Sequence, residues 1–385
     1  MKNYFSSNFK LGILGGGQLG KMMLTETQKL DICTYVLDPS SEAPCKNSCT
    51  AFFTGDLLDF ETVYQFGKKV DVLTIEIENI NIDALDKLEQ EGLTIVPKPK
   101  DLRIIQSKGT QKKHYLNHQI PTAPFIFFTS KEALLTSITN RKVSLPFVWK
   151  ATRFGYDGTG VKIVRNKEDL QVLPNVECIA EELIPFKNEL AVIVARNEDG
   201  EMKKYPVVEM EFHPEANQVE YVICPARIHK KITQQATDIA LKVALSFNFI
   251  GLLAVEMFQT QDDTIIVNEV APRPHNSGHY SIEASYTNQF EQHLRSILNL
   301  PLGNTESKVA GIMVNLVGEE GFSGNVHYEN IEEILKISGV TPHIYGKKQT
   351  RPFRKMGHVT IVDKDINTAR AVAQQVKEKI RVISH

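Results

Sequence analysis

Short apolar runs alternate with helical patterns over the first hundred residues of the chain. The runs cover Leu11 to Leu14, Cys33 to Leu37, Val72 to Ile77 and Thr94 to Val96. Apolar residues at helical spacing fill the segments between these runs. Strands that alternate with helices pair in parallel, so this region is predicted to form a doubly wound α/β sheet. The two prolines of VPKPK at 96–100 end the pattern and indicate a domain boundary.

From Pro124 onward the pattern changes, because strand-like segments follow one another with few helical segments between them. These segments are PFIFF, PFVWKA, GVKIV, ECIAEEL, ELAVIVAR and KKYPVVEMEF. Closely spaced strands predict an α+β region with antiparallel sheet. A helix at 231–247 and the strands GLLAVEMFQ and DTIIVNEVA follow. From residue 305 the chain is predicted to form the strands SKVAGIMVNLVG and GHVTIVD and a terminal helix.

The bulk composition narrows the class of protein. At 385 residues the chain is long enough for about two or three domains. A net charge of -2, with 23% charged residues, lacks the basic excess of a nucleic-acid binder. The first residues, MKNYFSSNFK, have no apolar signal core, and no apolar run is long enough to span a bilayer. We therefore expect a cytoplasmic protein without nucleic-acid or membrane partners, whose five cysteines are reduced.

A glycine-rich loop in KLGILGGGQLGKMM joins the first apolar run to a helical pattern. Gly15, Gly17 and Gly20 fit the pattern GxGxxG, and Asp38 ends the next apolar run. A dinucleotide-binding fold keeps its ribose-binding acid near that position, so an NAD-dependent oxidoreductase is one interpretation. The glycines establish a tight turn and a helix start that favours an anion. They do not identify the anion.

A second glycine-rich segment, WKATRFGYDGTGVKIV, lies between two predicted strands. Lys150 ends the first strand, and Gly155, Gly158 and Gly160 follow in the loop. Such a loop can close over phosphate oxygens with its backbone N–H groups, while the lysine supplies a point charge. A glycine-rich hairpin with a solvent-facing lysine has the same pattern. This segment alone therefore favours neither interpretation.

Two acids interrupt apolar strands further along the chain, Glu256 in LLAVEMF and Glu269 in IIVNEVAP. An unpaired carboxylate in a buried strand is costly in free energy. The turn QTQDD is predicted to join the strands into a hairpin that brings both carboxylates to one point. Mg²⁺ would satisfy both, with Asn268 as an amide ligand or a strand cap. Pairing of each acid with a buried Arg or Lys is the alternative.

Three further segments carry polar side chains in patterns typical of ligand sites. In AEELIPFKNEL, polar backbone groups beside the apolar Leu183 and Ile184 could bind an adenine ring. An ordinary strand has the same sequence pattern. The loop APRPHNSGH is stiffened by prolines and rich in donors, which favours an anionic or hydroxylated ligand. YGKKQTRPFRKMGH is either a phosphate site or a solvated basic surface, formed by Lys347, Arg351, Arg354, Lys355 and His358.

The order of these motifs resembles that of the ATP-grasp ligases. The motifs are the glycine loop, Lys150, GYDGTG, EELI, the acid in NE, APRPHNSGH and RKMGH. More narrowly, they resemble the N5-carboxyaminoimidazole ribonucleotide synthetases, the ATPase subunits of phosphoribosylaminoimidazole carboxylase in purine synthesis. The resemblance runs from about residue 10 to 365. It implies a Rossmann-like pre-ATP-grasp domain at 1–100, an ATP-grasp domain at 101–303 with a flap at 150–165, and a small C-terminal domain at 304–385 that completes the substrate site. The first glycine loop then belongs to the domain facing the substrate nucleotide, and no nicotinamide is expected.

The same resemblance implies a set of site residues. For ATP it implies Lys108, Lys150, Gly155, Tyr156, Asp157, Gly158, Thr159, Gly160, Val161, Glu181, Glu182, Leu183, Ile184, Glu189, His213, Asn268 and Glu269. It gives Mg²⁺ the ligands Glu256 and Glu269. For the aminoimidazole nucleotide it implies Tyr156, Asp157, Arg273, His275, Asn276, Ser277, Lys347 and Arg354, followed by Gln18, Leu19 and Glu78. One departure from the family pattern is Phe353, which stands where we expect a glycine.

The implied reaction transfers the γ-phosphoryl group of ATP to bicarbonate and gives carboxyphosphate. The exocyclic amine of aminoimidazole ribonucleotide then takes the carboxyl group, from that intermediate or from carbon dioxide that it releases. Asp157 would position the amine or take its proton, and Lys150 and Arg273 complete the implied catalytic set. The family also leads us to expect a homodimer.

Three other functions fit parts of the sequence. A formate-dependent glycinamide ribonucleotide transformylase would share the nucleotide site and differ in its acceptor. An NAD-dependent oxidoreductase would leave the flap and the paired acids without a role. A non-catalytic ATP-binding regulator is disfavoured by the presence of Lys150, Glu256 and Glu269.

Overall fold

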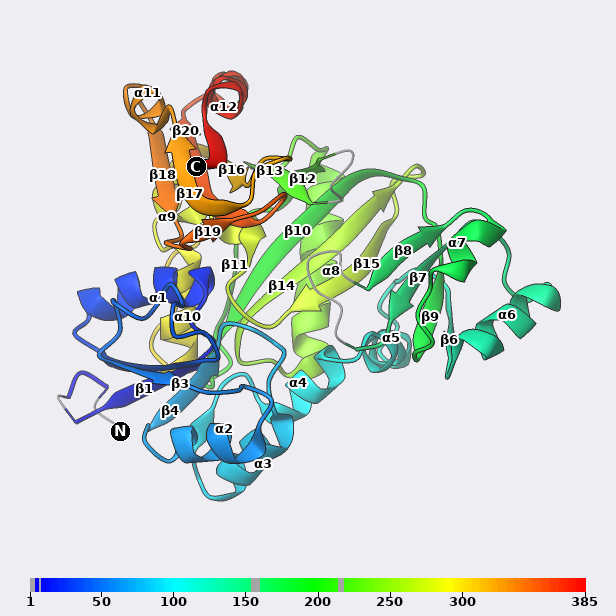
Figure 1. The fold of residues 1–385 in the computed structure, drawn as a ribbon, viewed down its shortest axis with the longest axis horizontal. Helices are drawn as coiled ribbons and strands as arrows, with labels where there is room; N and C mark the ends of the chain where they lie inside the picture. Colours follow the sequence, from blue (N-terminus) through cyan, green and yellow to red (C-terminus); the bar gives the residue numbers. More distant parts are fainter. Residues whose placement is uncertain (1–3, 7, 154–159, 214–217) are drawn as a thin grey trace.

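The computed structural model describes residues 4–6, 8–153, 160–213 and 218–385. Figure 1 shows an N-terminal sheet, a long central sheet that continues into the C-terminal region, and a small sheet at the far end of the molecule. No helix within these ranges combines the length and apolar character needed to cross a membrane.

The strands and helices have the following bounds. The strands are β1 (Lys10–Leu14), β2 (Cys33–Asp38), β3 (Ala51–Thr54), β4 (Val72–Ile75), β5 (Thr94–Ile95), β6 (Phe125–Phe128), β7 (Phe147–Ala151), β8 (Val161–Val164), β9 (Cys178–Glu182), β10 (Phe186–Arg196), β11 (Met202–Lys204), β12 (Val208–Phe212), β13 (Val219–Cys224), β14 (Gly251–Thr260), β15 (Ile265–Ala271), β16 (Ala310–Val317), β17 (Gly324–Glu329), β18 (Val340–Ile344), β19 (Gln349–Thr350), β20 (Lys355–Asp363) and β21 (Arg381–Ser384). The helices are α1 (Gln18–Lys29), α2 (Phe60–Gly67), α3 (Ile82–Gln90), α4 (Pro99–Ile105), α5 (Lys108–Asn117), α6 (Lys131–Thr139), α7 (Lys167–Gln171), α8 (Lys230–Phe247), the 3-10 helix η1 (Asn276–Gly278), α9 (Ser281–Ala284), α10 (Gln289–Ile297), α11 (Ile331–Leu335) and α12 (Ile366–Lys379).

The N-terminal sheet has the strand order β3-β2-β1-β4-β5 with parallel pairing throughout. This confirms the predicted doubly wound α/β region. Two details differ from the sequence pattern. β4 ends at Ile75 and not at Ile77, and the edge strand β3 was not predicted, because AFFT is short and only partly buried.

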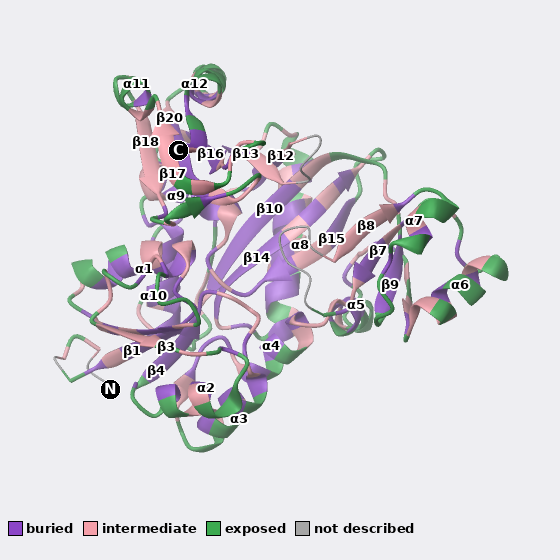
Figure 2. Cartoon of the chain, in the orientation of Figure 1, coloured by how far each residue is buried: buried purple, intermediate pink, exposed green. Residues whose placement is uncertain are grey.

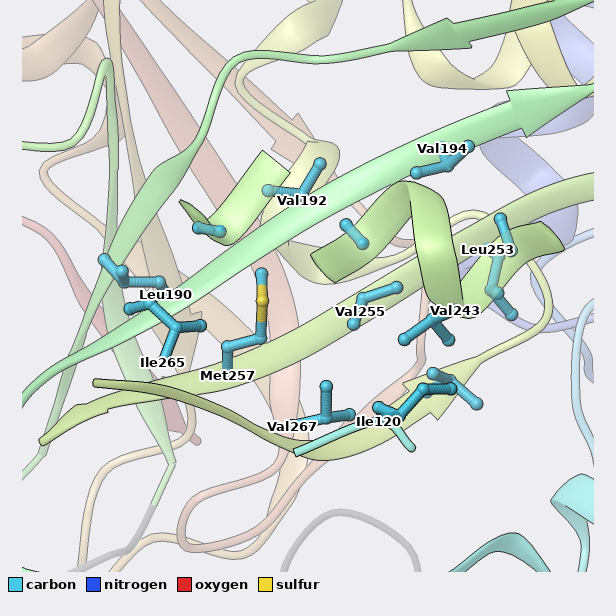
Figure 3. Packing of buried hydrophobic residues seen from close by; sticks show 14 of the residues in the cluster. Ile120, Leu190, Val192, Val194, Val243, Leu253, Val255, Met257, Ile265 and Val267 are labelled. Atoms are coloured by element: carbon cyan, nitrogen blue, oxygen red, sulfur yellow. The ribbon is translucent and has the colours of Figure 1, made fainter. Parts of the chain in front are cut away.

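The central sheet has the order β15-β14-β10-β12-β13-β16-β20-β18, and β11 pairs with β10. Antiparallel pairing of β10 with β12 and β14 confirms the predicted α+β region. The segment KKYPVVEMEF forms two strands, β11 and β12, because Pro206 lies between them and cannot donate to a sheet ladder. β10, β14 and β15 pack their apolar side chains against α8, as Figure 3 shows for Val192, Val255 and Val243.

Burial follows the layers of the fold. In Figure 2 the purple, buried residues lie along β10, β14 and α8, whereas the outer helices α6, α11 and α12 show green, exposed faces. The small sheet β6-β9-β7-β8 has a separate cluster of buried apolar side chains, which includes Trp149 and Leu134. This small sheet therefore has its own hydrophobic support and carries Lys150 at the end of β7.

The C-terminal region is joined to the central sheet by main-chain hydrogen bonds, because β16 pairs with β13 and with β20. Helix α12 covers this part of the sheet through Ala369, Ala373 and Val376. The strands β16 and β20 and the terminal helix match the predicted pattern. The short strands β17, β19 and β21 form a further sheet that was not predicted.

Candidate active site

A cavity of about 630 Å³ lies where the N-terminal sheet, the central sheet and the C-terminal region meet. Many of the residues that the sequence singled out line this cavity, although they come from segments more than three hundred residues apart. They are Gln18, Leu19, Glu78, Lys108, Glu256, Glu269, Arg273, His275, Asn276 and Lys347. The fold thus gathers the predicted phosphate, metal and substrate residues around one volume.

Glu256 and Glu269 are direct cross-strand partners on β14 and β15. The hairpin therefore brings both acids to one point, as predicted. A register shift between Glu256 and Met257 interrupts the ladder at this position. Nε2 of His275 lies 3.1 Å from Glu256, and Lys108 forms an ion pair with Glu269. The Lys108 ammonium holds the pKa of Glu269 well below its usual range.

A third acid, Glu189 on β10, is close enough to Glu256 and Glu269 for their charges to affect its pKa. Burial raises the pKa of Glu189 to about 8, and the negative charges of Glu256 and Glu269 act in the same direction. Glu189 is therefore largely protonated at neutral pH, and its pKa reflects the nearby negative charge of Glu256 and Glu269.

This donor set fits magnesium. Two carboxylates and the amide oxygen of Asn268 are ligands that Mg²⁺ accepts. In the structure these groups contact the side chains of Lys108, His275 and Lys150. In the described part of the chain, no three His, Cys, Asp or Glu side chains converge as a metal site.

Lys150 ends β7 next to the paired acids. Its Nζ donates to Oδ1 of Asn268 at 2.9 Å and lies 2.6 Å from Oε2 of Glu181. Oε1 of Glu181 lies 2.6 Å from Nζ of Lys112, a lysine that the sequence analysis overlooked. A signal for it was present, since Lys112 follows Lys108 by four residues and so shares its helix face.

The loop after β15 holds the predicted substrate residues. Nε of Arg273 lies 2.9 Å from Oε1 of Glu78, which links this loop to the N-terminal sheet. Nδ1 of His275 and Oγ of Ser277 are 2.9 Å apart. Ser277 is 1% exposed, and it is not among the residues that line the described part of the cavity. Asn276 begins η1 and lines the cavity.

The first glycine loop contains a carboxylate of the chain itself. The amides of Gly17 and Gly20 donate to Oε1 and Oε2 of Glu76, at 3.0 and 3.3 Å. Gly15 has a φ of 95°, and a Cβ there would lie 2.8 Å from Oε1 of Glu76. The backbone amides at the start of α1 are therefore occupied by a carboxyl group of the chain itself, Glu76, whose pKa is raised by burial. Its signal was an acid in the apolar run DVLTIEIEN, the same signal that identified Glu256.

The C-terminal basic cluster divides in two. Lys347 and Lys355 line the cavity, and Nζ of Lys347 donates to the backbone carbonyl of Lys355 at 2.7 Å. Arg354 donates to the carbonyl of Gln349 at 2.6 Å and lies outside the described lining. Phe353 has a φ of 61°, in the left-handed region that favours glycine. The family pattern that expects a glycine there is therefore explained by the backbone.

Several predicted ATP residues are not among the described residues that line the cavity. Glu182, Leu183 and Ile184 continue from β9, and Gly160 accepts a hydrogen bond from the amide of Ala151 just before β8 begins at Val161. His213 follows β12, and its ring centroid lies 6.1 Å from that of Phe353. Gly155, Tyr156, Asp157, Gly158 and Thr159 lie outside the described residues.

Comparisons with known proteins cover almost the whole chain. Models of a ribonucleotide synthetase preATP-grasp domain, an ATP-grasp domain and a phosphoribosylaminoimidazole carboxylase C-terminal domain match residues 9–106, 113–290 and 311–372. The N5-carboxyaminoimidazole ribonucleotide synthase of Bacillus subtilis is 38% identical over 91% of both chains. The chain belongs to the N5-carboxyaminoimidazole ribonucleotide synthase family. Its fold is accordingly a pre-ATP-grasp domain, an ATP-grasp domain and a family-specific C-terminal domain.

Solved structures of N5-carboxyaminoimidazole ribonucleotide synthases share this fold. The enzyme from Thermotoga maritima is 42% identical, with a TM-score of 0.90 over 98% of this chain and 100% of that one. The enzyme from Aspergillus clavatus, solved with ADP and 5-aminoimidazole ribonucleotide, is 33% identical, with a TM-score of 0.87 over 96% and 98% of the two chains. The chloroplastic phosphoribosylaminoimidazole carboxylase of Vigna aconitifolia is longer, and the chain spans 65% of it at 37% identity.

Membership in the N5-carboxyaminoimidazole ribonucleotide synthase family decides between the functions that the sequence left open. It agrees with Glu76 in the glycine loop, which takes the amides that a dinucleotide pyrophosphate would need. The NAD-dependent oxidoreductase interpretation is therefore wrong.

Proposed function

We propose that the cavity carries out ATP-dependent carboxylation of 5-aminoimidazole ribonucleotide with bicarbonate, giving N5-carboxyaminoimidazole ribonucleotide, ADP and phosphate. Membership in the family supports the ATP-dependent formation of this product from 5-aminoimidazole ribonucleotide in purine biosynthesis. The observation that supports the location is the meeting of Glu256, Glu269 and Lys108 with Arg273 and Lys347 around one cavity. Phosphoryl chemistry and nucleotide recognition can therefore take place side by side.

Bicarbonate must be activated, because its carbon is a poor electrophile until one oxygen becomes a leaving group. The bond between the γ-phosphorus of ATP and the β,γ-bridging oxygen breaks, and a bicarbonate oxygen forms a new bond to that phosphorus, giving carboxyphosphate and ADP. The exocyclic amine then attacks the carboxyl carbon of carboxyphosphate, or of carbon dioxide released from it. Phosphate leaves and the amine loses one proton, so atoms and charge balance.

Lys108 and Lys150 are the groups that we assign to the ATP phosphates. In the proposed reaction they release their present partners, Glu269 and Glu181, in favour of phosphate oxygens. Positive charge fixed around the transferring phosphoryl group stabilises its transition state. Magnesium held by Glu256 and Glu269 would supply further charge neutralisation at the same oxygens.

Recognition of adenosine and of the acceptor falls to other residues. We assign the adenine to the backbone at 181–184 and the ribose to Glu189, with His213 and Asn268 as further nucleotide contacts. Arg273, His275, Asn276 and Lys347 face the aminoimidazole nucleotide, and Arg354, Gln18, Leu19 and Glu78 complete that assignment. Asp157, on the flap at 150–165, is the proposed base for the amine.

The domain boundaries at 100 and 303 and a homodimeric state remain part of the proposal. The boundary at 303 is supported by the gap at 291–310 between two matched models. The preATP-grasp model continues to residue 106, six residues beyond the proposed boundary at 100. Support for a dimer is the family resemblance, and sedimentation of the purified chain would test it.

Phosphate release from ATP tests the function. We expect turnover that requires both aminoimidazole ribonucleotide and bicarbonate, and little turnover when glycinamide ribonucleotide and formate replace them. Glu269→Gln should nearly abolish turnover, because it removes one of the two magnesium carboxylates. Turnover with formate and glycinamide ribonucleotide, or near-normal turnover of Glu269→Gln at saturating magnesium, would contradict the proposal.

A further inference from the structure

Helix α5 carries two buried lysines on one face, and only Lys108 has a part in the proposed reaction. Lys112 lies one turn further on and is 2% exposed. Its ammonium lies 2.6 Å from Oε1 of Glu181 and donates to Oγ1 of Thr122 at 2.6 Å. A lysine is rarely buried to this degree unless it is paired. The two contacts therefore fix both the position and the charge environment of this ammonium.

Glu181 joins Lys112 to Lys150. The carboxylate is 4% exposed, and its second oxygen lies 2.6 Å from Nζ of Lys150. Burial alone would raise the pKa of Glu181, but the two ammonium groups outweigh burial and lower it. Burial lowers the pKa of Lys112 to about 8, which leaves it charged at neutral pH. The group is therefore an ammonium–carboxylate–ammonium triad with one net positive charge.

The net charge of this triad depends on Lys112. With both lysines present, one carboxylate is shared by two cations, so Lys150 keeps positive charge that can act on a phosphate. With Lys112 removed, Glu181 and Lys150 would form a buried one-to-one pair, and a buried pair of that kind is costly to break. Lys150 would then have to break its ion pair with Glu181 in order to contact a nucleotide phosphate.

We propose that Lys112 is a positioning residue of the ATP site, which shares the carboxylate of Glu181 so that Lys150 remains available to the nucleotide phosphates. Lys112 acts through Glu181, because its buried ammonium is held between Glu181 and Thr122. This inference rests on the proposed function only in taking Lys150 as a phosphate ligand. It assigns a role to a residue that neither the family resemblance nor the sequence pattern identified.

The test measures nucleotide affinity apart from turnover. Calorimetric titration with Mg·ADP needs no acceptor, so it remains informative even if the proposed reaction is wrong. Lys112→Met should weaken ADP binding by about tenfold or more, as expected when one partner of a buried charge group is lost. Lys113→Met is the matched control, because Lys113 is its exposed neighbour on the same helix, and ADP binding should remain unchanged.

Two further variants separate positioning from a general loss of structure. Lys112→Met with Glu181→Gln removes both charges, leaves Lys150 unpaired within the triad, and should bring ADP affinity back toward that of the wild type. Lys112→Arg keeps the charge and should bind ADP better than Lys112→Met. In steady-state assays, Lys112→Met should raise KM for ATP while KM for aminoimidazole ribonucleotide changes less than about twofold, since binding lost in one subsite appears in that substrate's KM.

A structural role would give a different pattern. Partial unfolding of Lys112→Met would lower the fraction of binding-competent protein and kcat, and would leave the dissociation constant for ADP and both KM values unchanged. That pattern would overturn the proposal. Equal ADP affinity in the single Lys112→Met variant and the double variant would also overturn it. If Lys112→Met does not fold, weaker ADP binding by the double variant than by Glu181→Gln alone would overturn it instead.

Discussion

Two single residues of this protein are expected to lower its free energy of unfolding. Asp101, near the start of α4, is 3% exposed, and burial raises the pKa of its carboxyl to about 6. Phe353 adopts a backbone conformation that suits glycine. Both features are predicted to cost stability, and both can be measured by conservative substitutions.

Asp101→Asn should stabilise the protein at neutral pH and not in acid. An acid whose pKa is raised in the folded state binds protons more readily there than in the unfolded state, so its cost appears as pH rises from about 4 to about 6. The full shift corresponds to roughly 3 kcal/mol, and we expect a gain of about 2 kcal/mol in unfolding free energy at pH 7.5. Denaturation at pH 7.5 and pH 4 checks this. A gain that is equal at both values would mean that the charge of Asp101 is not responsible.

Phe353→Gly should be more stable than Phe353→Ala by about 1 kcal/mol. Both variants lose the aromatic ring, and only alanine retains a Cβ in the left-handed conformation, which costs that much for most residues. Thermal unfolding of the two proteins side by side measures the difference. Equal stability would show that the loop relaxes to another backbone conformation once the ring is gone.

At the scale of elements, three histidine rings connect the segment after the substrate loop to the C-terminal strands. The ring of His358 on β20 lies 4.7 Å from that of His279 and 4.4 Å from that of His343 on β18, measured between centroids. Nε2 of His343 is 2.8 Å from Glu283 on α9. Burial lowers the pKa of His279 and of His358 well below the usual range. His279 and His358 therefore pack as neutral rings.

Acid should weaken this connection. The unfolded state takes up protons on these imidazoles near pH 6.5 while the folded state does not, so unfolding free energy falls as pH drops below that value. We expect a loss of roughly 2 kcal/mol per buried ring between pH 7 and pH 5. His358→Gln should show a smaller loss over the same range in chemical denaturation, whereas His118→Gln, on the exposed end of α5, should behave as the wild type. Identical pH slopes for all three proteins would contradict this assignment.

The sequence predicted those elements whose pattern reflects burial. Parallel strands that are covered on both faces are continuous apolar runs, so β1, β2 and β4 were recognised, and the turn QTQDD identified the hairpin of β14 and β15. The strands β17, β19 and β21 were missed, because β17 is largely half-buried and β19 and β21 are only two and four residues long. The site followed the same rule. Acids inside apolar strands identified Glu256 and Glu269, whereas Lys112 is typical of a solvated helix face until its burial is known.

At the scale of the whole molecule, the cavity depends on every part of the fold. Gln18 comes from α1, Arg273 from the loop after β15, and Lys347 from the C-terminal region. The amine of Lys21 donates to the carbonyl of Ile344 at 3.1 Å and so connects the two ends of the chain. A change in the C-terminal region should therefore alter the binding of the acceptor nucleotide specifically.

Lys347→Ala should raise KM for aminoimidazole ribonucleotide about tenfold or more. A charged hydrogen bond contributes roughly 1.5–3 kcal/mol. Lys347 lines the cavity, and the proposed function assigns it to the acceptor nucleotide. KM for ATP should remain within a small factor. Lys348→Ala is the control, because the neighbouring Lys348 is 73% exposed and pairs with Glu42 outside the cavity lining described above. Equal increases in both KM values would place Lys347 in a structural role.

The continuity of the central sheet has a consequence for how the chain is made. Synthesis proceeds from the N-terminus, so β13 is complete about ninety residues before its partner β16. Until then, β13 is an open strand edge on a ribosome-bound chain, and such edges invite pairing with other chains. Lys347 and Lys355 are synthesised later still. Unfinished chains therefore lack two lysines of the cavity lining. In the proposed assignment, they cannot bind the acceptor nucleotide fully until nearly the last residues have joined the fold.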